Sequence, residues 1–190
     1  MAFASFTSVT PIPPSTFTRL GPRVPDGVAQ AWHDHGTGLV GDGYFRLVDP
    51  ARAEAMLGTA SPLPSDAIIL FTTAMADLIA WWNTMFLVAK CRLGEIHATS
   101  ESFDQLIALM DDQPGYRDVI WDQQPYPQAR DRLGVPDFED CLMHVPLLKM
   151  GGRGDADHMH TGSLWTHVGL MTQLTGKPVF THMLPLPTQD

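Results

Sequence analysis

Two aspartates and two histidines lie within six positions of this sequence, in the stretch DADHMH. They are Asp155, Asp157, His158 and His160. Carboxylates and imidazoles are common zinc ligands, so this spacing would suit the active site of a metal-dependent hydrolase. A metal site needs ligands that rigid elements hold, however, and glycines flank this stretch on both sides. We therefore interpret it as a solvated loop, predict no metal and no cofactor, and keep the metal hydrolase as an alternative.

Other recognisable sites are absent from the sequence. It contains no nucleophile elbow, phosphate-binding loop, dinucleotide fingerprint or HExxH helix, and its basic residues form no stripe for nucleic acid. The longest apolar run, LIAWWNTMFLVA, is interrupted by Asn83 and Thr84 and is too short to span a bilayer. The N-terminus does not have the pattern of a secretion signal. These features predict a cytoplasmic protein that is not an enzyme and that contacts neither nucleic acid nor a membrane.

The charge of the chain is concentrated in one part of it. The 190 residues carry a formal net charge of −9, and residues 101–140 hold ten acidic residues against three arginines, a net of −7. We call residues 101–140 the acidic stretch. Such a field repels nucleic acid and attracts basic partners. The alternative is an acidic surface that is merely solvated.

The elements that would position these residues follow from hydrophobic periodicity. Four runs rich in β-branched and aromatic residues predict an antiparallel meander, with Trp81 and Trp82 on opposite faces. The runs cover residues 67–74, 77–83, 85–91 and 95–100. A further strand is predicted over 43–49, and residues 1–24 are predicted to form an extended arm. The fold class is therefore α+β, an antiparallel β-meander packed against several short helices.

Helices are predicted where apolar residues recur at helical spacing between capping residues. A helix that stops at Gly36 and one that Ser102 caps show this pattern most clearly. The helical segments are 26–35, 51–57, 102–112, one or two short helices in 115–134 interrupted by prolines, and 163–175. Cys91 and Cys141 lack a CxxC spacing and are expected to be buried thiols, since nothing in the sequence supports a disulfide.

Three stretches in this order resemble a known family. They are GDGYFRLVDP at 41–50, CLMHVPLLKMGG at 141–152 and THVGLMTQLTGKPV at 166–179. Their succession is similar to the GAD-like immunity proteins of type VI secretion systems, over about residues 15–180. The resemblance implies an N-terminal arm and GAD-like region in residues 1–62 and a C-terminal immunity region in residues 63–190, built as one continuous α+β unit.

The resemblance implies a function as well. Such proteins are cytoplasmic antidotes that bind and inhibit a cognate secreted nuclease, here one that degrades DNA, and they carry no catalytic motif. An acidic partner can cover the basic groove that a nuclease presents to phosphates, with an aromatic anchor at the centre of a charged rim. The alternative is a regulatory or scaffold module that binds another protein through the same acidic face. The oligomeric state is left open.

The candidate partner-binding residues come from the acidic stretch, which contains Trp121, and from Trp82 in the predicted meander. One of the tryptophans is expected to be exposed as the anchor. The candidates are Asp111, Asp112, Asp118, Trp121, Asp122, Asp137, Glu139, Asp140 and Trp82.

Overall fold

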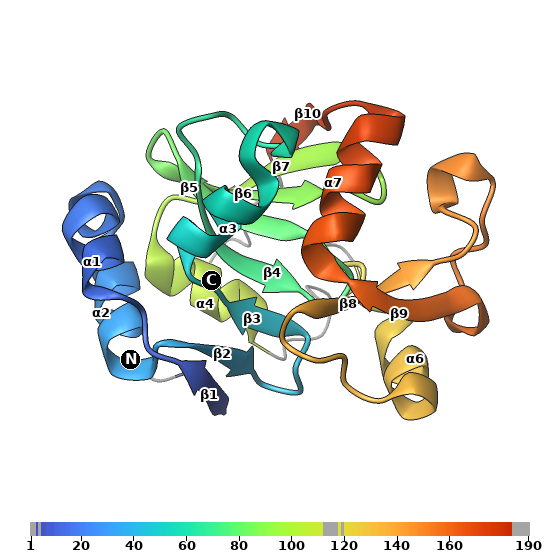
Figure 1. Cartoon of the computed structure of the whole chain (residues 1–190), viewed down its shortest axis with the longest axis horizontal. Coiled ribbons are helices and arrows are strands. Elements are labelled where there is room, and N and C mark those ends of the chain that lie inside the picture. Colours follow the sequence, from blue (N-terminus) through green and yellow to red (C-terminus); the bar gives the residue numbers. More distant parts are fainter. Residues whose placement is uncertain (1–2, 4, 112–117, 119, 184–190) are drawn as a thin grey trace, which may run out of the picture.

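A computed structural model describes residue 3 and residues 5–111, 118 and 120–183. Its centre is an eight-stranded sheet in the order β1-β2-β3-β4-β5-β6-β7-β10 (Figure 1). The strands are β1 (Phe6–Thr10), β2 (Thr37–Val40), β3 (Phe45–Leu47), β4 (Ile68–Thr73), β5 (Leu78–Trp82), β6 (Met85–Lys90), β7 (Glu95–Ser100) and β10 (Val179–Met183). Neighbouring strands are antiparallel except β7 and β10, which are parallel.

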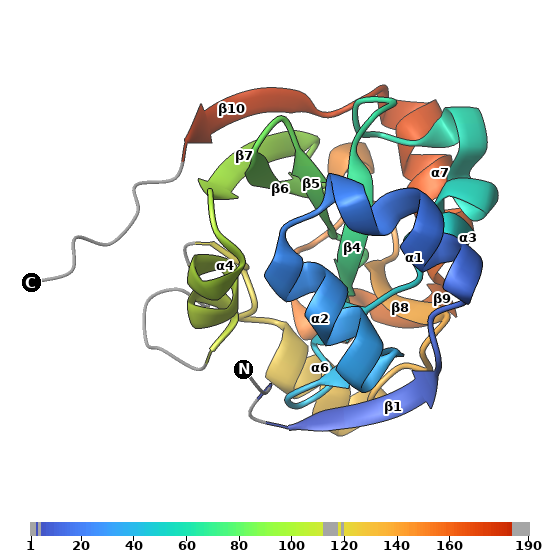
Figure 2. The same cartoon turned by 90° about the vertical axis from the view of Figure 1, so that its left-hand side faces the viewer.

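Helices cover the sheet on both faces, and a small second sheet lies beside it. Figure 2 shows α2 and α4 on one side of the strands, with α3 and α7 on the other. The second sheet pairs β8 (Asp140–His144) with β9 (Met159–Ser163). The helices are α1 (Pro14–Leu20), α2 (Asp26–His35), α3 (Pro50–Leu57), α4 (Phe103–Met110), α6 (Tyr126–Leu133) and α7 (Leu164–Thr175). Single 3-10 turns are η1 (Gly21–Arg23), η2 (Gly58–Ala60), η3 (Leu148–Met150) and η4 (Ala156–His158).

Each face of the sheet has its own hydrophobic core, because side chains alternate along each strand. Phe86 and Val88 point into the core beneath α2 and α4, whereas Leu87 points into the core beneath α3 and α7. A sheet covered on both faces needs nearly continuous apolar strands, which explains the uniformly buried β4. Trp81 packs against the first core and Trp82 against the second, so their predicted placement on opposite faces is confirmed.

The central meander and most helices lie where the sequence predicts them. The four strands β4 to β7 form the antiparallel meander, and the α+β class is confirmed. The helix α2 ends at Gly36, whose φ of 70° suits glycine. Ser102 caps α4 by accepting a hydrogen bond from the Gln105 amide at 3.2 Å.

The predicted extended arm over residues 1–24 is wrong in part. Residues 6–10 form the edge strand β1, which pairs with β2, and residues 14–20 form a helix. Pro14 stands at the first position of that helix, where the fixed φ of proline is already helical and its missing N–H is not needed. Prolines that suggest an extended chain therefore start a helix here. Among the described residues, no helix is long and apolar enough to cross a bilayer.

Candidate partner-binding surface

The acidic stretch does not form one continuous face. Asp111 and Asp118 are exposed in the segment that follows α4, on the side of the first core. Asp137 is exposed just before β8, while Asp112 lies outside the described residues. The structure thus separates the candidate acids into a group between α4 and α6 and a group around the start of β8.

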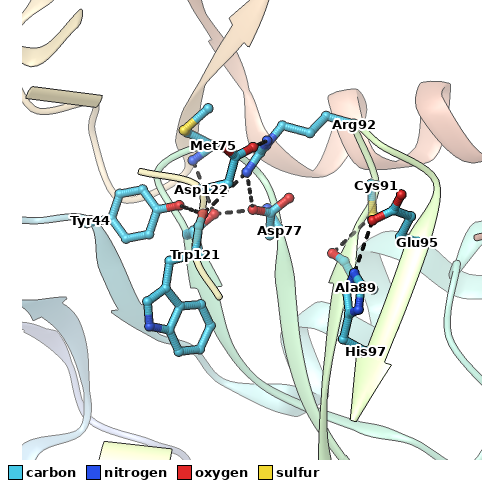
Figure 3. A network of polar contacts seen from close by, with 11 residues as sticks. Tyr44, Met75, Asp77, Ala89, Cys91, Arg92, Glu95, His97, Trp121 and Asp122 are labelled. Carbon is cyan, nitrogen blue, oxygen red and sulfur yellow. Dashed lines mark hydrogen bonds and ion pairs between the residues drawn. The ribbon is translucent and has the colours of Figure 1, made fainter. Parts of the chain in front are cut away.

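The group between α4 and α6 is joined to the protein interior by a network of buried charges (Figure 3). Arg92, in the turn between β6 and β7, donates from Nη2 to Asp77 Oδ2 at 3.0 Å and from Nη1 to Asp122 Oδ2 at 2.5 Å. The side chains of Arg92 and Asp77 are only 6% and 1% exposed, whereas that of Asp122 is 42% exposed. The network therefore reaches the surface at Asp122. We call Asp77, Arg92 and Asp122 the charged triad.

Topology explains why the first two residues of the charged triad meet. Asp77 directly precedes β5 in the β4–β5 connection, and Arg92 lies in the β6–β7 turn. Both connections stand at the same end of an antiparallel meander, so residues distant in the sequence become neighbours. Burial of charge is tolerated here because each ion has an opposite charge within hydrogen-bonding distance.

Burial and neighbouring charges act in opposite directions on the pKa values in this network. Burial raises the pKa of the Asp77 carboxyl, against the opposing effect of Arg92 and Lys90, and it lowers the pKa of Lys90. Burial acts to lower the pKa of Arg92 too, but Asp77, Tyr44 and Asp122 outweigh it and leave that pKa raised. Arg92 is thus held in its charged form.

The prediction of Trp121 as an exposed anchor is wrong. Trp121 is 1% exposed, its indole donates to the Leu109 carbonyl at 2.6 Å, and its ring lies 4.8 Å from that of Phe45. Its own carbonyl accepts from the Tyr44 hydroxyl at 2.8 Å and from Arg92 Nη2 at 3.4 Å. The large apolar ring gains more by entering the core than by remaining at the surface. Trp121 therefore packs in the core and fixes the backbone around it, and it does not contact a partner at the surface.

Glu139 and Asp140 have structural contacts at the start of β8. Glu139 accepts from Arg52 of α3 and from the Trp165 indole of α7, both at 2.8 Å, so each carboxylate oxygen joins a different helix to β8. The backbone carbonyl of Asp140 accepts a short hydrogen bond from Arg46, a fully buried side chain. The side chain of Glu139 is still 42% exposed.

Trp82 lies away from the charged triad. It precedes the β5–β6 turn, at the opposite end of the meander from Arg92, a separation of roughly 20 Å for a six-residue strand. Trp82 is half-buried, donates to Asp66 Oδ1 at 2.8 Å and lies 5.8 Å from the exposed ring of Phe180. The structure therefore does not bring Trp82 together with Asp122.

Contacts of Asp155 with nearby residues hold the DADHMH stretch in its conformation. Asp155 accepts from the His158 amide at 3.3 Å, contacts His158 Nδ1 at 2.5 Å and pairs with Arg153 at 3.0 Å. These contacts cap the 3-10 turn η4, and Met159 and His160 already belong to β9, so the interpretation of this stretch as a solvated loop is wrong in part. The hydrogen bond with His158 lowers the pKa of the Asp155 carboxyl. The described part of the chain contains no group of three or more histidine, cysteine or acidic side chains placed to hold a metal ion.

Sequence reasoning missed Tyr44, Asp77 and Arg92, whose contacts hold Trp121 and Asp122 in place. A signal for two of them was present. Asp77 and Arg92 are charged residues within or beside strongly apolar runs, and a buried charge requires an opposite charge nearby. The sequence could not show which charges pair, because the pairing depends on the order of the strands.

Comparison with known proteins found one matching family model and a solved structure with a similar fold. Residues 100–175 match the family model described as T6SS immunity protein Tdi1, C-terminal. The fold is similar to the crystal structure of Atu4351 from Agrobacterium tumefaciens, with a TM-score of 0.69 and 14% identity over 89% of this chain and 86% of that chain. At that identity the likeness shows a shared fold. No curated protein sequence matches the chain. The match over residues 100–175 supports a type VI secretion immunity family for this protein.

Proposed function

We propose that this protein is a cytoplasmic immunity protein that binds a cognate type VI secreted nuclease and prevents it from degrading DNA. The observation that carries the proposal is the family match over residues 100–175, which begins just before the acidic stretch and contains α4, α6 and α7. In this proposal residues 1–62 form the N-terminal arm and GAD-like region, and residues 63–190 form the immunity region of the same continuous unit. The protein itself catalyses nothing in this scheme, and it requires no metal or cofactor.

The proposed mechanism is competition for a basic groove. A nuclease attracts phosphates with lysine and arginine side chains, and a surface of fixed carboxylates can occupy the same groups. Asp111, Asp118 and Asp122 supply such carboxylates between α4 and α6. Their field would also accelerate association with a basic partner at low ionic strength.

The acids at the start of β8 and Trp82 provide a second set of proposed contacts. Asp137, Glu139 and Asp140 stand beside α3 and α7 through the contacts of Glu139. Because these residues and Trp82 are separated from the first group by the fold, each set is best tested by its own variants.

The experiment is co-expression with the effector encoded beside this gene. We expect the two proteins to co-purify, and we expect the effector to stop cleaving plasmid DNA when this protein is added in equal amount. Effector separated from the co-purified complex by denaturation and then refolded supplies the active nuclease for the cleavage assay. A purified effector that cleaves DNA equally well in the presence of this protein would contradict the proposal. Stable binding to a different cellular protein instead would favour the regulatory or scaffold alternative.

A further inference from the structure

Asp122 has a backbone conformation that residues with side chains usually avoid. Its φ is +51°, in the left-handed region, although it is not a glycine. Strain of this kind persists only where surrounding contacts maintain it, and it concentrates at functional positions. The conformation of Asp122 thus calls for an explanation from its contacts.

Those contacts come from buried residues on three separate parts of the fold. Arg92 holds Asp122 Oδ2 and also reaches the carbonyl of the preceding residue, Trp121. Tyr44, which is 1% exposed, donates to that same carbonyl at 2.8 Å. Asp77 fixes the other side of the Arg92 guanidinium at 3.0 Å. Both the carboxylate and the peptide group of this turn are therefore held in one orientation.

Stability alone does not account for this arrangement. Asp77 Oδ1 and Arg92 Nε are buried without a hydrogen-bond partner among the described residues. Buried ion pairs recover their desolvation cost only when their remaining polar atoms are satisfied, and well-packed apolar residues often do as well. The network does hold the turn at Trp121 and Asp122 in a single conformation, and this turn is where the network reaches solvent.

Among the residues that the structure describes, only one oxygen of the Asp122 carboxylate has a partner. Oδ2 is bound by Arg92, whereas Oδ1 has no partner among the described residues, and the side chain is 42% exposed. An ionised carboxylate can accept several hydrogen bonds, including bonds from two guanidinium groups. A carboxylate whose orientation is already fixed loses little entropy when it binds a further donor.

We propose that Asp122 is a preorganised contact residue whose Oδ1 accepts a hydrogen bond from a lysine or arginine of the cognate effector. Arg92 and Tyr44 are positioning residues, which hold the turn without touching the effector. This inference rests on the proposed function, which it deepens by naming the contact and the groups that orient it.

The decisive pair of variants is Asp122→Gly and Asp122→Asn. Glycine adopts a positive φ without strain but has no carboxylate, so Asp122→Gly relieves the turn and removes the contact. We expect it to weaken effector binding about tenfold or more, the factor for one charge-assisted hydrogen bond. Asp122→Asn keeps the shape and loses the charge, and we expect a similar loss. If the residue mattered only for the shape of the turn, Asp122→Gly would bind as tightly as the wild type, and this result would overturn the contact role.

The matched control is Asp131→Asn, which removes one acid from the same stretch. Asp131 lies on α6 with a side chain 77% exposed, outside the charged triad. We expect its dissociation constant for a catalytically inactive effector to stay within about twofold of the wild type. Equal losses for Asp131→Asn and Asp122→Asn would show that only overall charge matters, and would overturn the proposed contact.

The positioning role is tested without the effector. Tyr44→Phe removes the hydroxyl that binds the Trp121 carbonyl and changes no charge. We expect faster amide hydrogen exchange at residues 120–123 than in the wild type, with unchanged exchange in β5 and β6. Unchanged exchange at residues 120–123 would overturn the positioning role. If the wild type does not bind the effector at all, the proposed function and the contact role both fall, while the exchange result still decides the positioning role.

Discussion

The guanidinium of Arg92 lies 3.0 Å from the carboxylate of Asp77, and neither side chain is more than 6% exposed. This pair joins the two connections at one end of the central meander. The same guanidinium binds Asp122, so a contact inside the protein is continuous with a carboxylate at its surface. The buried end of the sheet is therefore coupled to the turn at Trp121 and Asp122.

Replacing Asp77 should destabilise the protein strongly. Asp77→Ala leaves Arg92 buried with only the half-exposed Asp122 as an opposite charge, and we expect a loss of about 3 kcal/mol in the free energy of unfolding. Urea denaturation followed by tryptophan fluorescence measures this quantity. Asp131→Ala, at an exposed position, should change it by less than about 0.5 kcal/mol. A similar small change for both variants would show that the buried pair does not contribute as described.

Stability should decrease as the pH falls below the ordinary pKa of histidine. His144 of β8 and His167 of α7 line one small cavity together with Arg92, and both imidazoles are buried. Burial lowers the pKa of both; Arg92 lowers that of His144 further, and His144 lowers that of His167 further. Because the folded protein disfavours the protonated imidazoles, the unfolded chain takes up more protons on acidification. The stabilisation is present above about pH 6.5 and is lost as the pH falls from there through the lowered pKa values.

Urea midpoints at pH 7.5 and at pH 5.5 check this dependence. We expect a lower midpoint at pH 5.5, and a smaller difference between the two pH values for His167→Gln, which cannot take up a proton. The exposed histidine variant His33→Gln serves as the control, since its side chain is 78% exposed. A wild-type midpoint that is equal at the two pH values would contradict the buried, neutral state of His144 and His167.

The sequence predicts the part of the fold that depends on local pattern. The meander follows from alternation and β-branched residues, and α4 follows from Ser102 and the apolar spacing behind it. The strands β2 and β10 were not predicted, because short segments with glycine or mixed polarity become strands only through their neighbours in the sheet. The same reason explains β1, which is almost entirely exposed and is defined by its pairing with β2.

Less of the candidate site than of the fold could be predicted from the sequence. The excess of acids is visible in the sequence, but their division between two parts of the surface depends on how α4 and β8 pack. Trp121 and Trp82 have the same side chain, and only their tertiary surroundings make one buried and the other half-exposed. The partner of Asp122 is thirty positions away and could be identified only when the strand order brought Arg92 to it.

The two cysteines should be inert in the folded protein. Cys91 and Cys141 are buried free thiols, as the sequence predicts. Burial raises the pKa of Cys91 and raises that of Cys141 to about 12, so little thiolate forms at neutral pH. We expect a colorimetric disulfide reagent to label neither thiol at pH 8 in the native protein and both in guanidinium chloride. Rapid labelling of the native protein would contradict their burial.

Reversal of charge in the acidic stretch should slow the encounter with the effector. Replacing Asp111, Asp112 and Asp122 together by lysine changes the local charge by six units, and electrostatic steering depends on that field. We expect the association rate constant to fall by at least about tenfold at low salt, with a smaller difference at high salt, where charges are screened. Stopped-flow fluorescence at several salt concentrations measures the rate, after urea denaturation has shown that the variant stays folded without the contact between Asp122 and Arg92.

The control for this charge reversal is a variant with the same change in net charge, made at residues outside the acidic stretch. Asp26, Asp34 and Asp157 are exposed and lie outside the acidic stretch, so their replacement by lysine makes the same change in total charge and leaves the acids of the acidic stretch in place. We expect a reduction of the association rate by less than about threefold in that protein. If the replacement of Asp111, Asp112 and Asp122 leaves the association rate at low salt unchanged, the effector does not bind at these acids.

Replacing Asp137, Glu139 and Asp140 by lysine gives the corresponding test for the second group of acids. The stability of that variant must be measured first, because it loses the contacts of Glu139 with Arg52 and Trp165.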